Sequence, residues 1–137
     1  MTEAPFCKYI FVYGTLRRGS TVPQAEILVR MGRFVGPAKI NARLFDLGSF
    51  PGMVAPEQAG QWVHGDVFEM FDPAKVLLLI DDYEGCGPKA KTPYDFERAI
   101  VSVTLDNAMP SQAWAYWYVK DVAAQRRIMS GDYRAKG

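Results

Sequence analysis

The stretch "YIFVYGTLRRGS" (Tyr9–Ser20) predicts a strand that is followed directly by a loop. Its continuous apolar start predicts a β-strand over about Lys8–Tyr13, and Gly14 ends that run. The following loop holds two arginines and a second glycine, Gly19. The spacing from Gly14 to Ser20 is close to that of a phosphate-binding P-loop, which would have lysine at position 20. Three alternatives follow: an altered nucleotide site, a plain turn, or a loop that binds another anion.

The composition indicates one domain with a substantial core. The chain has 137 residues, of which 49% are hydrophobic, so we expect a single domain with its core at about 8–120 and a tail at 121–137. The formal net charge of +1 provides no strong field that would attract nucleic acid or an anionic membrane. The short basic pairs Arg17-Arg18 and Arg126-Arg127 are typical of a solvated surface.

The sequence gives little indication of a metal site or of a membrane-spanning helix. The chain has two cysteines, Cys7 and Cys86, and one histidine, His64, whereas a structural zinc site needs about four such ligands. The two cysteines could form one disulfide, but a reduced cytoplasmic protein is the expectation. Residues 1–5 lack a basic and apolar signal segment, and no apolar run approaches the roughly 18 residues of a membrane helix. We therefore expect a soluble protein with no metal site.

A short helix is expected after the first strand. Ser20 or Thr21 can cap its start, and Pro23 suits its first turn. Gly32 can end it. The other expected elements are strands at about 42–47, 61–71, 96–105 and 112–119, a rigid turn-rich loop at 47–56, a hairpin turn at 106–110, and one short helix after 121. The sequence contains no internal repeat.

A second helix, "DPAKVLLLIDDYEG", is the most informative element of the chain. Its first residue, Asp72, is a good N-cap, and its last residue, Gly85, is a suitable stop. Val76, Ile80 and Tyr83 recur at the spacing of one helix face, so they predict the stripe that is buried against the rest of the domain.

Glu84 lies on an unexpected face of this second helix. At about 100° per residue it falls between Ile80 and Leu77, so it projects from the apolar face near the helix end. Asp82, by contrast, lies on the opposite face. Burial and the negative end of the helix dipole both disfavour the charged carboxylate, so the pKa of Glu84 is expected to rise toward neutrality, which suits a general acid or base. The alternative is that Glu84 turns to the surface or pairs with an arginine such as Arg98.

Several stretches in order resemble the γ-glutamylcyclotransferase-like family (AIG2-like, including the γ-glutamylamine cyclotransferases). "FVYGTLRRG" and "LIDDYEG" carry the resemblance, and "RLFDLGSFPGMV", "VHGDVFEM", "FERAIVSV" and "AWAYWYV" extend it over most of Ile10–Val119. The resemblance implies a compact α+β domain built on a small, mostly antiparallel β-barrel with a few short helices.

The resemblance also implies an activity. Enzymes of this family cyclise a γ-glutamyl group: its α-amine attacks its own γ-carbonyl and releases 5-oxoproline and an amine. The catalytic glutamate of the family matches Glu84, which would serve as both general base and general acid. Because the substrate supplies the nucleophile, no cofactor or metal is implied. The expected partner is a small γ-glutamyl amide or peptide, and the protein is expected to be a monomer or weak homodimer.

The loop after the first strand is the implied anion site. Tyr13, Gly14, Thr15 and Leu16 match the family's loop, and their backbone amides are assigned to an anion, because a turn after a strand can aim consecutive N–H groups into one concavity. Both the α-carboxylate of the substrate and the developing oxyanion remain open as that anion.

Other residues have weaker assignments. The further substrate-binding candidates are Phe50, Pro51 and Gly52, which form a pocket wall or only a rigid loop, and Tyr116, which matches a family tyrosine. Core packing of Tyr116 with its neighbours at period two, Trp114 and Tyr118, is the alternative. Arg98 matches the arginine of a Tyr-x-Arg pattern in the family, but Phe96 stands in place of the tyrosine.

Three further functions compete with a cyclotransferase. A non-catalytic module could keep the anion loop and bind a small carboxylate, although it would not need an unpaired acid at Glu84. A P-loop protein would need the missing lysine and a second acid at a strand end. A thiol enzyme built on Cys86 would need a nearby base, for which His64 is the sole histidine.

Overall fold

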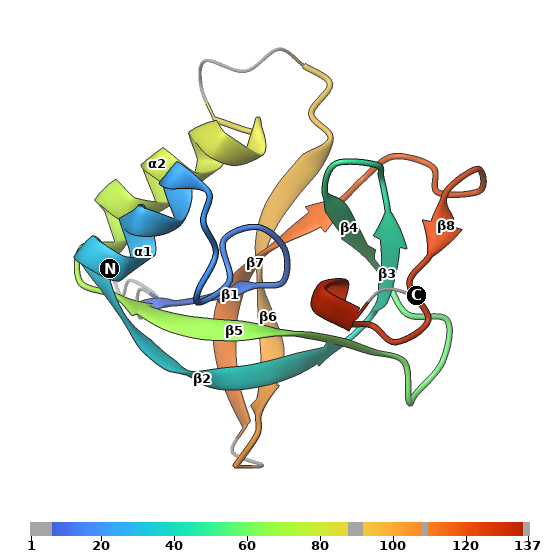
Figure 1. Cartoon of the computed structure of the whole chain (residues 1–137), viewed down its shortest axis with the longest axis horizontal. Coiled ribbons are helices and arrows are strands. Elements are labelled where there is room, and N and C mark those ends of the chain that lie inside the picture. Colours follow the sequence, from blue (N-terminus) through green and yellow to red (C-terminus); the bar gives the residue numbers. More distant parts are fainter. Residues whose placement is uncertain (1–6, 88–91, 108–109, 136–137) are drawn as a thin grey trace, which may run out of the picture.

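The computed structural model describes residues 7–87, 92–107 and 110–135, which form eight strands and two helices of regular length (Figure 1). The strands are β1 (Tyr9–Val12), β2 (Gly32–Asn41), β3 (Arg43–Asp46), β4 (Pro51–Val54), β5 (Trp62–Met70), β6 (Phe96–Leu105), β7 (Pro110–Tyr118) and β8 (Arg126–Arg127). The helices are α1 (Glu26–Met31) and α2 (Pro73–Glu84), with the short 3₁₀ turns η1 (Pro23–Ala25) and η2 (Tyr133–Ala135).

Two sheets make up the domain. Five strands close into a barrel in the order β1-β5-β2-β6-β7, and three form a smaller sheet in the order β4-β3-β8. Every pairing is antiparallel except that of β1 with β7, which is parallel. The expected α+β fold on a small, mostly antiparallel barrel is confirmed. The hairpin expected at 106–110 is visible in the pairing of β6 with β7, although residues 108–109 lie outside the described residues.

Strand β1 is buried on both faces, which explains its continuous apolar sequence. Phe11 packs in the cluster that also contains inward residues of β2 and β5, whereas Ile10 and Val12 pack in a second cluster with Ile80 of α2. Successive strand residues point to opposite faces, so one face of β1 fills the barrel and the other supports the helices. Figure 1 shows α1 and α2 side by side on that side of the barrel.

Helix α2 follows the sequence prediction closely. The Asp72 carboxylate accepts a hydrogen bond from the Lys75 amide at 3.3 Å, and Gly85 ends the helix in the left-handed region at φ 74°. The buried side chains include Val76 and Ile80. No helix in the described part of the chain is long and apolar enough to cross a membrane.

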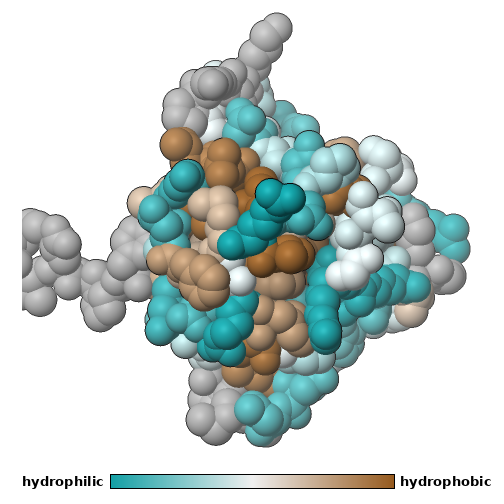
Figure 2. Space-filling model, turned by 60° about the vertical axis from the view of Figure 1, so that its left-hand side comes forward, coloured by the Kyte–Doolittle hydropathy of each residue, from teal (hydrophilic) through white to brown (hydrophobic). Residues whose placement is uncertain are grey.

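The helices bury one apolar stripe and leave other apolar side chains at the surface. Val29 on α1, Phe71 before α2 and Leu78 on α2 are exposed. Figure 2, which turns the helical side forward, shows apolar surface interspersed with polar groups on this face.

Three local expectations differ from the structure. The helix after β1 has no cap from Ser20 or Thr21, because it starts later, through η1, with Val22 at the N-cap. No strand was expected between that helix and residue 42, yet Gly32–Asn41 form the long strand β2, with a bulge after Phe34. The loop expected at 47–56 contains strand β4, which starts at Pro51, where proline's missing N–H is tolerated.

The tail after residue 120 is part of the core, contrary to the expectation that the core ends there. Ile128 is 3% exposed and packs in the barrel cluster, and its amide donates to the Leu44 carbonyl at 2.8 Å. Strand β8 pairs with β3, and the Gly131 carbonyl accepts from the His64 amide at 2.8 Å. Ile128 and Met129 are an isolated apolar pair between polar residues and gave no periodic signal, so this packing was not visible in the sequence.

Arg17 is buried, and the expectation of a solvated Arg17-Arg18 pair is wrong for it. Arg17 is 7% exposed, and its guanidinium lies 3.4 Å from the Asp66 carboxylate and 2.9 Å from that of Asp132. Asp66, which is 3% exposed, also accepts from the Arg18 amide at 2.9 Å. The side chain of Arg134 hydrogen-bonds the Arg18 carbonyl. This ion cluster joins the loop after β1 to β5 and to the tail.

Candidate functional site

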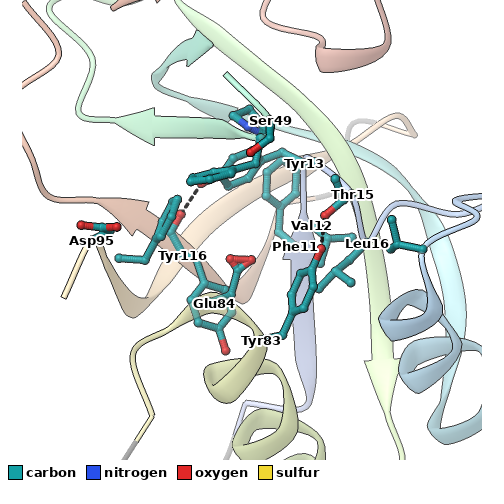
Figure 3. Close-up of a pocket in the computed structure, with 15 residues that line it drawn as sticks. Phe11, Val12, Tyr13, Thr15, Leu16, Ser49, Tyr83, Glu84, Asp95 and Tyr116 are labelled. Carbon is teal, nitrogen blue, oxygen red and sulfur yellow. Dashed lines mark hydrogen bonds between the residues drawn. The ribbon is translucent and has the colours of Figure 1, made fainter. Parts of the chain in front are cut away.

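One cavity of about 410 Å³ lies between the loop after β1, the C-terminal end of α2 and the loop before β4 (Figure 3). Eight of the nine residues assigned from the sequence line it: Tyr13, Gly14, Thr15, Leu16, Phe50, Pro51, Glu84 and Tyr116. The ninth, Gly52, is not among the lining residues. A Cβ at Gly52 would lie 2.7 Å from Leu47 Cδ1 and 2.9 Å from Tyr118 Cβ, so its lack of a side chain lets β4 pack closely against β7.

Glu84 is the last residue of α2, and its carboxylate points into the cavity (Figure 3). Burial, and secondly the negative charge of Asp81, raise the pKa of Glu84 to about 7. Within the described residues, this carboxylate has no hydrogen-bond or ion-pair partner. The alternative pairing with Arg98 is wrong, because Arg98 binds Asp81 at 2.8 Å instead. Glu84 can therefore take up and release a proton near neutral pH.

The loop after β1 faces Glu84 across the cavity and offers free backbone donors. Among the described residues, the amides of Gly14, Thr15 and Leu16 have no hydrogen-bond acceptor. Pro51 forms the adjoining wall, so close that a Cβ at Gly14 would lie 2.9 Å from Pro51 Cγ. No lysine, arginine or histidine is among the described lining residues, so the donors that the cavity offers to an anion are neutral ones, backbone amides and side-chain hydroxyls.

Two buried tyrosines hold the cavity walls together. The Tyr13 hydroxyl donates to the Tyr116 carbonyl at 2.6 Å and accepts from the Met53 amide at 3.2 Å. Burial, together with the charge of Glu84, raises the pKa of Tyr13, so its hydroxyl stays protonated. The Tyr116 hydroxyl donates to the Asp81 carboxylate at 2.5 Å. Tyr116 is therefore both a core residue and a cavity wall, and the two alternatives weighed from the sequence are compatible.

Several lining residues were not predicted from the sequence. Tyr83, which was assigned to the buried stripe, lines the cavity, and its hydroxyl lies 2.6 Å from Thr15 Oγ1, so it links α2 to the loop after β1. Phe96 also lines the cavity and packs against Phe50 with ring centroids 5.9 Å apart. Its position in the Tyr-x-Arg pattern was the signal that could have placed it here. The remaining lining residues are Phe11, Val12, Val22, Ser49 and Asp95.

The chain is similar to known proteins over most of its length. The model of the family described as "Gamma-glutamyl cyclotransferase, AIG2-like" matches residues 10–135. A Methanocaldococcus jannaschii protein provisionally named a gamma-glutamylcyclotransferase is 30% identical over 128 residues, which cover 93% of this chain and 96% of the relative. A Rattus norvegicus protein named Gamma-glutamylaminecyclotransferase is 32% identical over 88 residues, which cover 57% of this chain and 55% of the rat protein.

The fold has counterparts among solved structures. The crystal structure of an AIG2-like protein from Mus musculus matches with a TM-score of 0.66 and 23% sequence identity. The match covers 85% of this chain and 80% of the mouse chain. At that identity the similarity supports the shared fold, a closed barrel with short helices, and nothing finer.

Proposed function

Because the chain belongs to the AIG2-like gamma-glutamyl cyclotransferase family, we propose that it converts a γ-glutamyl amide into 5-oxoproline and a free amine. One observation carries the proposal. The Glu84 carboxyl, with its pKa raised to about 7, faces three unpartnered amides, those of Gly14, Thr15 and Leu16, across a single cavity. Such a pair of features suits a reaction that moves one proton and develops one negative charge.

In the proposed reaction, the α-amine of the substrate forms a C–N bond to its own γ-carbonyl carbon and closes a five-membered ring. The ionised Glu84 carboxylate accepts the proton that the amine loses. The bond between the carbonyl carbon and the leaving nitrogen then breaks, and the protonated carboxyl returns the proton to that nitrogen. The same group takes up and releases one proton, so the step is balanced, and no water is consumed.

The other cavity residues have proposed roles in binding. The free amides of Gly14, Thr15 and Leu16 would hold either the α-carboxylate or the oxyanion, because backbone N–H groups fixed by a turn stabilise either charge without reorganisation. Phe50, Pro51 and the Tyr116 ring would contact the aliphatic part of the substrate. Tyr13 would mainly support the wall, since its hydroxyl is already hydrogen-bonded twice.

The nucleophile and the electrophile belong to one molecule, so the enzyme's task is to hold the substrate in its cyclising conformation. Positioning of this kind can supply several kcal/mol of the barrier, on the order of 7 to 11 in favourable cases. The proposal therefore assigns no cofactor, metal or protein nucleophile to the reaction.

Product identity tests the proposal. The protein is incubated with γ-glutamyl amino acids, γ-glutamyl amines and glutathione, and 5-oxoproline, glutamate and the released amine are quantified by mass spectrometry. We expect equal amounts of 5-oxoproline and amine from at least one compound. Glutamate in place of 5-oxoproline would identify a hydrolase instead. Saturable binding of these compounds with no product from any of them would favour the non-catalytic binding module.

A further inference from the structure

Asp81, one turn before Glu84 on α2, is held by two strands of the barrel. Its carboxylate accepts two hydrogen bonds from the Arg98 guanidinium, at 2.8 and 3.0 Å, and a third from the Tyr116 hydroxyl at 2.5 Å. Arg98 lies on β6 and Tyr116 on β7. A planar guanidinium that binds both carboxylate oxygens fixes the direction of the acid as well as its distance.

This contact holds the last turn of α2, where apolar packing is limited to the partly buried Tyr83. The buried residues of α2 end at Ile80, so the last turn has no fully buried apolar anchor. The Arg98 guanidinium is itself placed 4.4 Å from the Trp114 ring centroid, which orients it toward the helix. The backbone carbonyl of Asp81 also accepts from the Cys86 amide at 3.0 Å, within the turn that ends the helix. The Asp81 side chain thus joins the helix end to the barrel, and its backbone carbonyl takes part in closing the helix.

We propose that Asp81, clamped by Arg98 and Tyr116, is a positioning residue that fixes Glu84 in the cavity and sets the charge that Glu84 faces. The kinetic part of this inference rests on the proposed function, but the structural and electrostatic parts do not. Arg98 does not line the cavity, so it acts through Asp81 and not on a substrate.

The negative charge of Asp81 acts on the pKa of Glu84 in a definite direction. The titratable or charged side chains near the cavity end of α2 are Asp81, Tyr83 and Cys86 on or next to the helix, Tyr13 after β1, Asp95 and Arg98 before and on β6, and Tyr116 on β7. Among these, Asp81 adds to burial in raising the pKa of Glu84. A negative neighbour disfavours ionisation, so removing its charge favours the ionised form of Glu84.

A carboxyl ¹³C NMR titration tests the effect of Asp81 on the pKa of Glu84 without any substrate. Glutamate carboxyl carbons are labelled, and the Glu84 signal is identified by its absence in Glu84→Gln. In Asp81→Asn, which keeps the size of the side chain, we expect the Glu84 midpoint to move to lower pH by about half a unit or more. Asp82→Asn is the matched control, because it removes the same charge from an exposed site on the same helix and should leave the midpoint in place.

Arg98→Gln tests the same charge effect on the Glu84 titration from the other side of the ion pair. It leaves the Asp81 charge without its cation, so the midpoint is expected at or above the wild-type value. An unchanged midpoint in Asp81→Asn, or a downward shift in both Asp81→Asn and Arg98→Gln, would overturn the proposal, because the sign would then not follow the charge. If Asp81→Asn does not fold, a downward shift in Arg98→Gln alone is sufficient to overturn it.

The positioning part is measured by kinetics. In Asp81→Asn we expect kcat to fall about tenfold or more while KM changes little, because a displaced acid impairs the reaction more than it impairs binding. A rise in KM with unchanged kcat would contradict a positioning role. Failure of the wild-type protein to turn over any substrate would count against the proposed function alone, since the NMR titration would still report on Asp81.

Discussion

Replacement of Glu84 by glutamine is expected to lower kcat by a factor of about 10² to 10⁴, because the amide can neither accept nor return a proton. Glutamine has nearly the same shape, so the cavity and its walls should persist. The half-buried carboxylate has no partner among the described residues, and the loss should therefore not destabilise the fold. The rate of 5-oxoproline release at substrate saturation measures the effect, and ligand binding by calorimetry shows whether the cavity is intact.

Asp82→Asn is the control for this variant. Asp82 lies on the same helix, two residues away and exposed, and it does not line the cavity. We expect activity within about twofold of wild type for Asp82→Asn, since an exposed charge is screened by solvent. Full activity in Glu84→Gln would show that another group moves the proton and would remove the basis for the proposed mechanism.

Replacement of Arg17 by methionine is expected to lower the free energy of unfolding by about 3 to 5 kcal/mol, the usual cost of leaving a buried charge without its partner. Asp66 is 3% exposed and would keep the hydrogen bond from the Arg18 amide but lose its cation. Asp132 would lose its 2.9 Å ion pair as well. Urea unfolding of the variant and the wild type gives the difference directly.

Arg30→Met is the matched control for Arg17→Met. Arg30 also pairs with an acid, Glu26 at 3.3 Å, but both side chains are exposed on α1. An exposed pair of this kind contributes less than about 1 kcal/mol, so the variant should unfold almost as the wild type does. Equal effects of the two substitutions would show that Arg17 is as solvated as its sequence context suggested.

The parts of the fold that could be predicted are those with local signals. Strand β1 has an uninterrupted apolar run, and α2 has an N-cap at Asp72 and a stop at Gly85, so both elements were recognisable without knowledge of their partners. Strands β4 and β8 are short and are defined by pairing with β3, which lies far from β8 in the sequence. Ile128 and Arg17 become buried only because those pairings bring the tail over the barrel.

In the candidate site too, the residues with a local signal could be predicted, and the contacts between distant elements could not. The helical period alone placed Glu84 on the apolar face, and the resemblance to a family located the loop of Tyr13 to Leu16. The partner of Arg98 could not be predicted, because Asp81 and Glu84 lie one turn apart and only the packing of α2 on β6 decides which acid it meets. The hydroxyl pair of Tyr83 and Thr15 was missed for the same reason, since it joins elements that approach one another only in the folded chain.

The pH dependence of kcat/KM tests the central claim, that Glu84 is the general acid and base of a cyclotransferase. For the best substrate found, and after correction for the measured titration of the substrate amine, kcat/KM should rise with pH and reach half of its plateau near pH 7. The sign follows from the mechanism, because Glu84 must be ionised to accept the proton, and its pKa is raised to about 7. A profile that is flat from about pH 5.5 to 8, or one with its midpoint near the ordinary glutamate value of about 4.3, would contradict the claim.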